Sequence, residues 1–263
     1  MAELTLSIQN AEGTTLAVSK DTHTVTLVYN SCYQMGDSIV FHTSETNRHY
    51  MIQLEDTMEP AFVYMAKNEY TLRIPFEEQK TSYNPRSFIG KGHYLSARAA
   101  SLEEIAAYKN LAKNVYDTHG NESCYPHAFA NVETRGEAVF AARNAIDGLL
   151  ANFSHGTYPF ASWGINQNPD AEWTLEFGRS VQIDKIVIFL RADFPHDNWW
   201  KEITVSYSDG TTMIFNMEKT HKGQSFSFPK KEITWLRLSH LIKADEPSPF
   251  PALSQLEVYG NEA

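Results

Sequence analysis

The residues best suited to chemistry lie between Arg191 and Trp200, in the run Arg-Ala-Asp-Phe-Pro-His-Asp-Asn-Trp-Trp. The apolar run from Ile183 to Leu190 predicts a buried strand before this cluster, and the alternating run from Ile203 to Tyr207 predicts another after it. The cluster therefore lies on a connection between two strands. Indole rings stack on the C–H face of a sugar, while charged and amide groups bind its hydroxyls. The ligand-binding candidates in this loop are Arg191, Asp193, His196, Asp197, Trp199 and Trp200.

The same loop has a structural alternative. The two adjacent Trp side chains can cover the core at the edge of a sandwich while the polar side chains cap turns. Two large aromatic side chains left in water would forgo their burial energy, so they are expected to meet either a ligand or the core.

Charge and length restrict the class of protein. The chain has 263 residues and a formal net charge of −10, with its acidic residues spread along the sequence. Nucleic acids and anionic membranes attract basic surfaces, so neither is an expected partner. No apolar run approaches the length of a membrane span, and oligomeric state is not encoded in any recognisable pattern.

The cellular compartment of the protein is predicted from its first residues and from its cysteines. The start, Met-Ala-Glu-Leu-Thr-Leu, lacks the basic and apolar regions of a secretory signal, which predicts a cytoplasmic protein for the chain as given. Trimming of the N-terminus or non-classical export would instead place it outside the cell. Cys32 and Cys124 lie far apart in the sequence, so two free thiols are expected.

The first hundred residues contain short alternating segments bounded by turn residues, a pattern typical of an all-β sandwich or jelly roll. The predicted strands are Leu4 to Gln9, His23 to Tyr29, Ser38 to His42, Tyr50 to Leu54, Phe62 to Ala66 and Tyr70 to Pro75. No catalytic or metal-binding spacing occurs in this half.

The pattern changes at Ser101. Ser-Leu-Glu-Glu forms a capping box with Ser101 and Glu104, and apolar residues then recur at helical spacing. A short helix is therefore expected to join an N-terminal domain, residues 1–100, to a second domain, residues 101–263. The fold class predicted for the whole chain is all-β, with two sandwich domains.

The second half contains short strands without intervening helices, which again predicts an antiparallel sandwich. Ser208-Asp209-Gly210 supplies a hairpin turn between two of them. The predicted strands are Trp173 to Phe177, Ile183 to Leu190, Ile203 to Tyr207, Met213 to Asn216, Ser225 to Phe228, Ile233 to Leu238 and Leu253 to Tyr259.

Six short motifs then occur in a family order. They are Asn144-Ala-Ile-Asp-Gly148, Ser162-Trp163, Trp173-Thr-Leu-Glu-Phe-Gly178, Ile183-Asp-Lys-Ile186, Tyr207-Ser-Asp-Gly210 and Leu256-Glu-Val-Tyr-Gly260. Together they resemble the discoidin, or coagulation factor 5/8 type C, domains. The resemblance covers about residues 108–260. This segment is similar to the branch of galactose-binding-like jelly rolls that includes the family 32 carbohydrate-binding modules.

The resemblance implies a structural calcium ion under the Ala-x-Asp-Gly turn, because a hard cation prefers oxygen ligands. The matching positions are the Asp147 carboxylate, the backbone carbonyls of Ala142 or Asn144, the Ser162 hydroxyl, and Glu257. The chain departs from the family at Gln255, which stands where an acidic ligand is expected. An Asp-Gly turn that needs no metal is the alternative.

The resemblance also implies that ligand loops gather at one end of the sandwich. The insertion from Leu149 to Ala161 is expected to meet the Arg191 to Trp200 loop there, adding His155 as a polar contact and Tyr158 as a stacking surface. The proline-rich run from Lys243 to Pro251 is a third contributor to this end, or else a rigid crossover.

These features favour a non-catalytic carbohydrate-binding protein. A protein-interaction module is the alternative, since related discoidin domains bind proteins or lipid head groups. A glycoside hydrolase or lyase using Asp193, His196 and Asp197 is a weaker one. Arg191 and His196 favour ionised carboxylates, which suit hydrogen bonding better than acid catalysis. The sequence lacks the Gly-x-Ser-x-Gly, His-Glu-x-x-His and phosphate-loop motifs of common enzymes.

Overall fold

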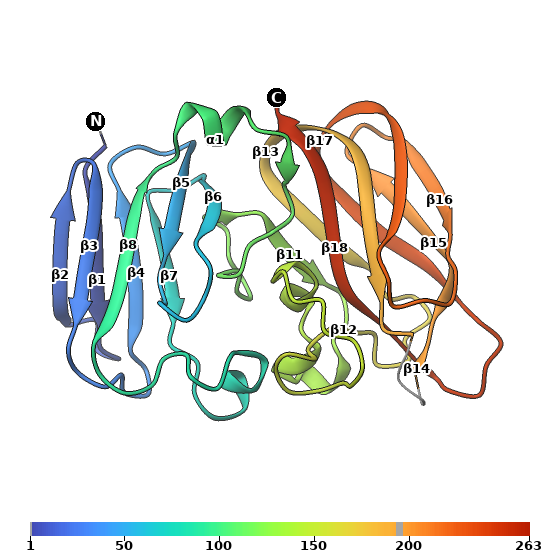
Figure 1. Cartoon of the computed structure of the whole chain (residues 1–263), viewed down its shortest axis with the longest axis horizontal. Helices are drawn as coiled ribbons and strands as arrows, with labels where there is room; N and C mark the ends of the chain where they lie inside the picture. Colours follow the sequence, from blue (N-terminus) through green and yellow to red (C-terminus); the bar gives the residue numbers. More distant parts are fainter. Residues whose placement is uncertain (1, 193–196) are drawn as a thin grey trace.

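The computed structural model describes residues 2–192 and 197–263. They form two β-rich halves that lie side by side along the long axis, with strands β1 to β8 in one half and β11 to β18 in the other (Figure 1). This confirms the predicted all-β fold class. No helix in the described residues is long and apolar enough to cross a membrane.

The N-terminal half is a sandwich of two antiparallel sheets, with strand orders β2-β1-β4-β7 and β10-β6-β5-β8-β3. Alternate side chains of β3 are buried, as a sheet with one solvated face requires. The strands are β1 (Leu4–Gln9), β2 (Thr15–Asp21), β3 (Thr24–Tyr29), β4 (Ser38–Thr43), β5 (Arg48–Gln53), β6 (Ala61–Met65), β7 (Glu69–Arg73), β8 (His93–Ala99) and β10 (Cys124–Tyr125).

Three strands of this half, β2, β8 and the two-residue β10, were not predicted. The side chains of β2 are largely exposed because it is an edge strand, so it lacks a strong apolar alternation. The inward residues of β8 are His93, Leu95 and Ala97, none of which is β-branched.

The predicted capping box is present at the N-terminus of α1 (Leu102–Ala106). The Ser101 hydroxyl accepts from the Glu104 amide at 3.2 Å, and the Glu104 carboxylate accepts from the Ser101 amide at 2.7 Å. These two bonds satisfy amide groups that the first helical turn leaves without partners.

The segment after α1 contacts both halves. Leu111 belongs to the hydrophobic core of the C-terminal half, whereas Val115, Tyr116 and Cys124 belong to that of the N-terminal half. Strand β9 (Lys109–Asn110) pairs with the C-terminal sheet and β10 with the N-terminal one. The boundary predicted between residues 100 and 101 stays a prediction. Both cysteines are free thiols, as expected.

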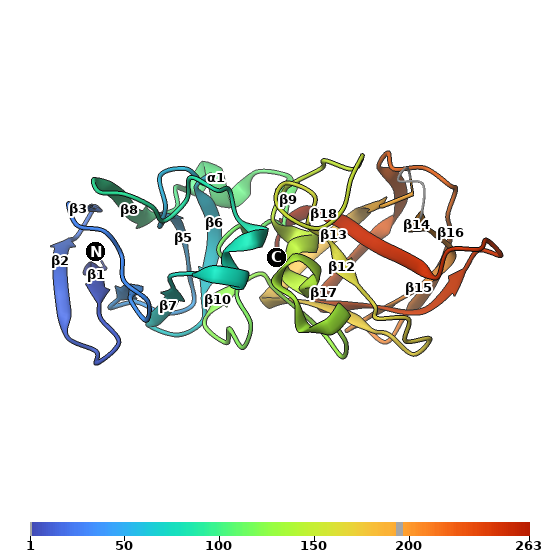
Figure 2. The ribbon, with the colours of Figure 1, turned by 90° about the horizontal axis from the view of Figure 1, so that it is seen from below.

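The C-terminal half is built on the strand order β12-β18-β13-β17-β15-β16, with β9, β11 and β14 as further pairings. Its strands are β11 (His127–Ala130), β12 (Trp163–Gly164), β13 (Trp173–Leu190), β14 (Asp197–Asn198), β15 (Trp200–Tyr207), β16 (Thr212–Asn216), β17 (Gln224–Lys243) and β18 (Phe250–Glu262). The short 3-10 turns η1 (Glu77–Ser82), η2 (Thr134–Gly136), η3 (Ala138–Phe140) and η4 (Ala142–Ile146) lie near the junction of the two halves (Figure 2).

Several predicted strands are parts of longer ones. The segments Trp173 to Phe177 and Ile183 to Leu190 are both parts of β13, whose register shifts between Glu176 and Val181. Gly178 lies at that irregularity with a φ of +68°, a conformation that side chains disfavour. The glycine that follows the first predicted strand therefore marks a bulge inside one longer strand.

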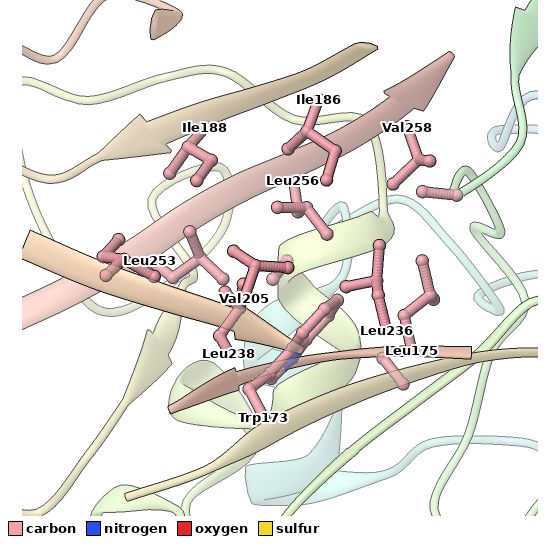
Figure 3. Packing of buried hydrophobic residues seen from close by; sticks show 14 of the residues in the cluster. Trp173, Leu175, Ile186, Ile188, Val205, Leu236, Leu238, Leu253, Leu256 and Val258 are labelled. Atoms are coloured by element: carbon pink, nitrogen blue, oxygen red, sulfur yellow. The ribbon is translucent and has the colours of Figure 1, made fainter. Parts of the chain in front are cut away.

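Apolar side chains of β13, β15, β17 and β18 fill the space between the layers of the C-terminal half (Figure 3). Trp173, Leu175, Val205, Leu236 and Leu256 are completely buried. Burying a large apolar side chain stabilises a fold by about 1.5–3 kcal/mol. This core gives the loops at the ends of the strands a rigid base.

A charged cluster joins the two halves beside β18. The Glu262 carboxylate accepts two hydrogen bonds from Arg179, both at 2.7 Å, and lies 3.0 Å from His49 Nε2 of the N-terminal half. The Arg179 guanidinium lies over the ring of Tyr64, and Lys109 lies over the ring of Phe62. The junction is therefore held by charge as well as by apolar contact.

Candidate functional site

Arg191 and Asp197 form a buried ion pair in the loop that follows β13. Arg191 Nε lies 3.3 Å from Asp197 Oδ2, and their side chains are 5% and 1% exposed. A buried charge is stable only when paired, so the two residues fix one another. Asp193 and His196 lie outside the described residues.

The insertion after Leu149 reaches this loop through Arg191 and Asn152. Arg191 Nη1 donates to the carbonyl of Phe160 at 3.3 Å. The buried Asn152 amide donates to the carbonyls of Leu190 and His221, and its oxygen accepts from Ser254 at 2.7 Å. Side-chain bonds to backbone carbonyls thus place the insertion against the end of β13.

The proline-rich segment before β18 is the third part of the candidate site, after the loop that follows β13 and the insertion. Strand β14 pairs in parallel with β18, aligning Asp197 with Phe250. The buried Asn198 amide donates to the carbonyls of Ala244, Glu246 and Ser248, at 3.3, 3.3 and 2.6 Å. One asparagine therefore holds the segment from Lys243 to Pro251 in place.

The three loops enclose a cavity of about 170 Å³ at this end of the sandwich. His155, Arg191 and Asp197 line it together, so the structure brings these three predicted residues to one place. The described residues that complete the wall are Thr134, Arg135, Phe140, Gly164, Ile165, Asn166, Gln167, Pro249, Phe250, Pro251 and Ala252.

Several of these wall residues were missed at the sequence level. Asn166 and Gln167 adopt φ angles of +49° and +58°, a region that non-glycine residues seldom occupy. Such backbone conformations concentrate at functional sites. The run Asn-Gln-Asn-Pro from 166 to 169 is a turn signal that could have directed attention to them.

The aromatic side chains of the cavity also differ from those predicted. Phe140 and Phe250 line it, and Phe250 is 48% exposed. Trp200 is completely buried, although it is out of phase with the inward residues Ile203, Val205 and Tyr207, because the register of β15 shifts between Trp200 and Glu202. Its ring is 6.1 Å from that of Trp163 in the core, so the expectation that Trp200 stacks on a ligand is wrong for this structure.

Trp199 and Tyr158 lie away from this cavity as well. The indole of Trp199 donates to Glu246 at 3.0 Å and is partly buried against the core. Tyr158 lines a separate cavity at the junction with the N-terminal half, and its amide donates to the carbonyl of Thr81 at 2.8 Å. The insertion thus faces two directions, with His155 toward one cavity and Tyr158 toward the other.

The Asp147 turn is where the family resemblance implies a calcium ion. Asp147 is 8% exposed, and its Oδ1 accepts from the Leu149 amide at 2.8 Å. Burial raises the pKa of Asp147 to about 7, although Arg143 and Lys113 nearby lower it.

Two of the other implied ligands, the Ala142 carbonyl and Glu257, accept hydrogen bonds from within the protein. The carbonyl of Ala142 accepts from the Trp173 indole, and Gln255 Oε1 accepts from the Gly148 amide. Glu257 accepts from Tyr259, and the Asn144 side-chain amide donates to the carbonyls of Ala138 and Ser162. The buried Ser162 hydroxyl has no hydrogen-bond partner within the described residues.

These oxygen atoms do not supply the six to eight ligands that a calcium ion takes. Among the described residues, no group of three or more His, Cys, Asp or Glu side chains is placed to hold a metal ion.

No protein-family model and no curated protein sequence matches the chain. Solved structures resemble it in fold. One is a chain of the Streptococcus pneumoniae β-galactosidase BgaA, 18% identical, with a TM-score of 0.45, covering 59% of this chain and 99% of that one.

Two further structures cover a similar share. The family 32 module of Clostridium perfringens NanJ in complex with galactose is 17% identical over 50% of this chain and 91% of that one, with a TM-score of 0.39. The lectin domain of lectinolysin, complexed with Lewis B antigen, is 16% identical over 59% and 98%, with a TM-score of 0.41. The C-terminal half is a largely antiparallel β-fold, as its strand pattern predicted.

Proposed function

We propose that the chain binds carbohydrate, without catalysis, in the cavity between the three loops of its C-terminal half. The observation that carries the proposal is the placing of Arg191, Asp197 and His155 around one cavity together with the exposed ring of Phe250. Charged and imidazole groups bind sugar hydroxyls, while an aromatic ring packs on the C–H face.

The size of the cavity restricts the ligand. Its volume is about 170 Å³, below the roughly 300–1,000 Å³ of sites for drug-sized ligands. We therefore expect it to take one sugar unit, such as the end of a glycan, with the remainder of the chain in solvent.

The charges in the cavity favour binding over hydrolysis. Glycoside hydrolysis generally uses two carboxylates on opposite sides of the scissile bond, one of them with a raised pKa. Asp197 is the carboxylate that the described wall contains, and it is paired with Arg191. An ion pair keeps a carboxylate ionised, which suits hydrogen bonding to hydroxyls.

A glycan array of the intact chain tests the proposal, followed by calorimetry with the best glycan and the double variant Arg191→Met/Asp197→Asn. The double variant removes both charges, so it avoids a buried unpaired ion. We expect the wild type to bind and the folded double variant to lose at least tenfold in affinity. Equal affinity in the two proteins would exclude this cavity. Absence of binding to every glycan would favour protein interaction, and glycan cleavage by the wild type would contradict the non-catalytic function.

A further inference from the structure

The turn at Asp147 and Gly148 lies where the two halves meet. It lines a cavity of about 210 Å³ together with Glu59 of the N-terminal half and Lys113 of the connecting segment. We propose that Lys113, Arg143 and Gln255 stabilise this turn in place of the calcium ion implied by the family resemblance, so that the fold is independent of calcium.

Lys113 lies directly on the turn. A Cβ atom added to Gly148 would be 2.8 Å from Lys113 Cε and 3.3 Å from Lys113 Nζ. Gly148 also has a φ of +85°. The turn therefore requires glycine for its backbone conformation and for the close approach of the lysine. The ammonium group brings a positive charge to the face of the turn beside Asp147.

Arg143 supplies a second positive charge from inside the protein. It is 7% exposed, and its guanidinium donates to the carbonyls of Asp117 and Val115 at 2.7 and 3.2 Å. Arg143 and Asp147 line the same cavity. Because its hydrogen bonds go to two backbone carbonyls and to the Asn144 side-chain oxygen, the guanidinium is held in place inside the protein.

Gln255 completes the arrangement. Its side chain is completely buried, and Oε1 accepts from the Gly148 amide at 3.2 Å. A carboxylate here would add a second buried negative charge, which a divalent cation would neutralise. The neutral amide holds the same turn by a hydrogen bond and adds no charge beside Asp147.

The Lys113 cation also connects the turn to the N-terminal half, since its ammonium group pairs with Glu59. The side chain of Glu59 is 72% exposed, so this pair mainly orients the lysine. The stability of the turn therefore depends on its contact with Lys113 of the connecting segment. A calcium ion would instead have stabilised the turn through ligands of the turn itself.

The first test is thermal unfolding of the wild type in millimolar calcium chloride and in excess chelator, with calcium binding measured by calorimetry. We expect the two melting temperatures to agree within about 1 °C and no calcium binding. A melting temperature that falls by several degrees in chelator and returns with calcium would overturn the proposal.

Variants then test the cause. We expect Lys113→Met to lower the melting temperature by roughly 3 °C or more, and Lys113→Arg to restore most of it. Lys67→Met is the matched control, because Lys67 also pairs with an exposed glutamate, Glu122, but lies far from the turn. Equal effects of the two Met variants would contradict the role of Lys113.

A gain-of-function variant gives a further outcome. Lys113→Met/Gln255→Glu removes one cation and adds a carboxylate, so we expect calcium to raise its melting temperature while leaving the wild type unchanged. If calcium stabilises neither protein, Lys113 and Gln255 are not what replaced the metal, and the proposal fails.

Discussion

Two buried carboxylates of the C-terminal half, Asp197 and Asp147, are held in different ways. At the ligand cavity, the carboxylate of Asp197 is neutralised by Arg191 from the same loop. At the junction of the two halves, the turn at Asp147 is contacted by Lys113 of the connecting segment and held by a hydrogen bond to Gln255. The first site lies within the C-terminal half, whereas the second depends on how the halves pack. Changes at the cavity should therefore alter ligand binding, and changes at the junction should alter stability with binding kept.

The largest expected effect is that of Arg191→Met, because it leaves Asp197 buried without its counter-ion. We expect a loss of about 3–5 kcal/mol in unfolding free energy, measured by urea denaturation. Arg191→Met/Asp197→Asn should recover much of this loss but not ligand binding. A single variant as stable as the wild type would show that the pair is not buried in solution.

The charged cluster at Glu262 tests the junction by pH. Burial raises the pKa of Glu262, but hydrogen bonds from Arg179 and His49 outweigh it and leave the pKa at about 2. A carboxylate with a depressed pKa stabilises the fold above its unfolded value, about 4.5, and this contribution is lost as the pH falls toward 2. The contribution is about 3 kcal/mol at most.

Glu262→Gln removes this titration. We expect its unfolding free energy to depend less on pH between about 4.5 and 2 than that of the wild type, in urea denaturation at a series of pH values. Glycan affinity at neutral pH should be unchanged. Parallel pH profiles for the two proteins would contradict the assigned pKa.

Asn198→Ala should have an intermediate effect. It removes the donor to three carbonyls of the segment before β18. Leaving buried polar groups unsatisfied costs about 1–3 kcal/mol, and glycan affinity should fall as this wall of the cavity loosens. Asn261→Ala is the control, since that amide makes one exposed bond to Ala106. Similar losses in both variants would show that Asn198 does not organise the site.

Phe250→Ala should have the smallest effect on stability, because its side chain is half exposed. Loss of ring stacking is worth roughly 0.5–1.5 kcal/mol, so affinity should fall about two- to tenfold by calorimetry. Ile214→Ala truncates an exposed apolar side chain that does not line the cavity. If Ile214→Ala weakens binding equally, the ring is not a contact surface.

The pattern of the sequence was informative where local chemistry decides the structure. The capping box at Ser101, the free cysteines and the alternating strands follow from residue types and short spacings. The alternating segments of the C-terminal half predicted its largely antiparallel strands. The two strands predicted on either side of Gly178 are one strand, because a glycine with positive φ permits a bulge within it.

The candidate site could be predicted only in part. A concentration of Arg, Asp and His near Arg191 is visible in the sequence, and the structure places Arg191 and Asp197 on a cavity with His155. Phe140, Phe250 and Gln167 come from segments far apart in the chain, and no short-range pattern links them. Trp200 was predicted at the ligand site, but its register on β15 directs its side chain into the core.

By itself, then, the sequence determined the strands, the linking helix and the fold of the second half, because these depend on periodicity and turn chemistry between near neighbours. The tertiary structure alone decided which aromatic rings reach the cavity and which cations meet Asp147. Both depend on strand register and on the packing of the two halves, which bring together residues from distant parts of the chain.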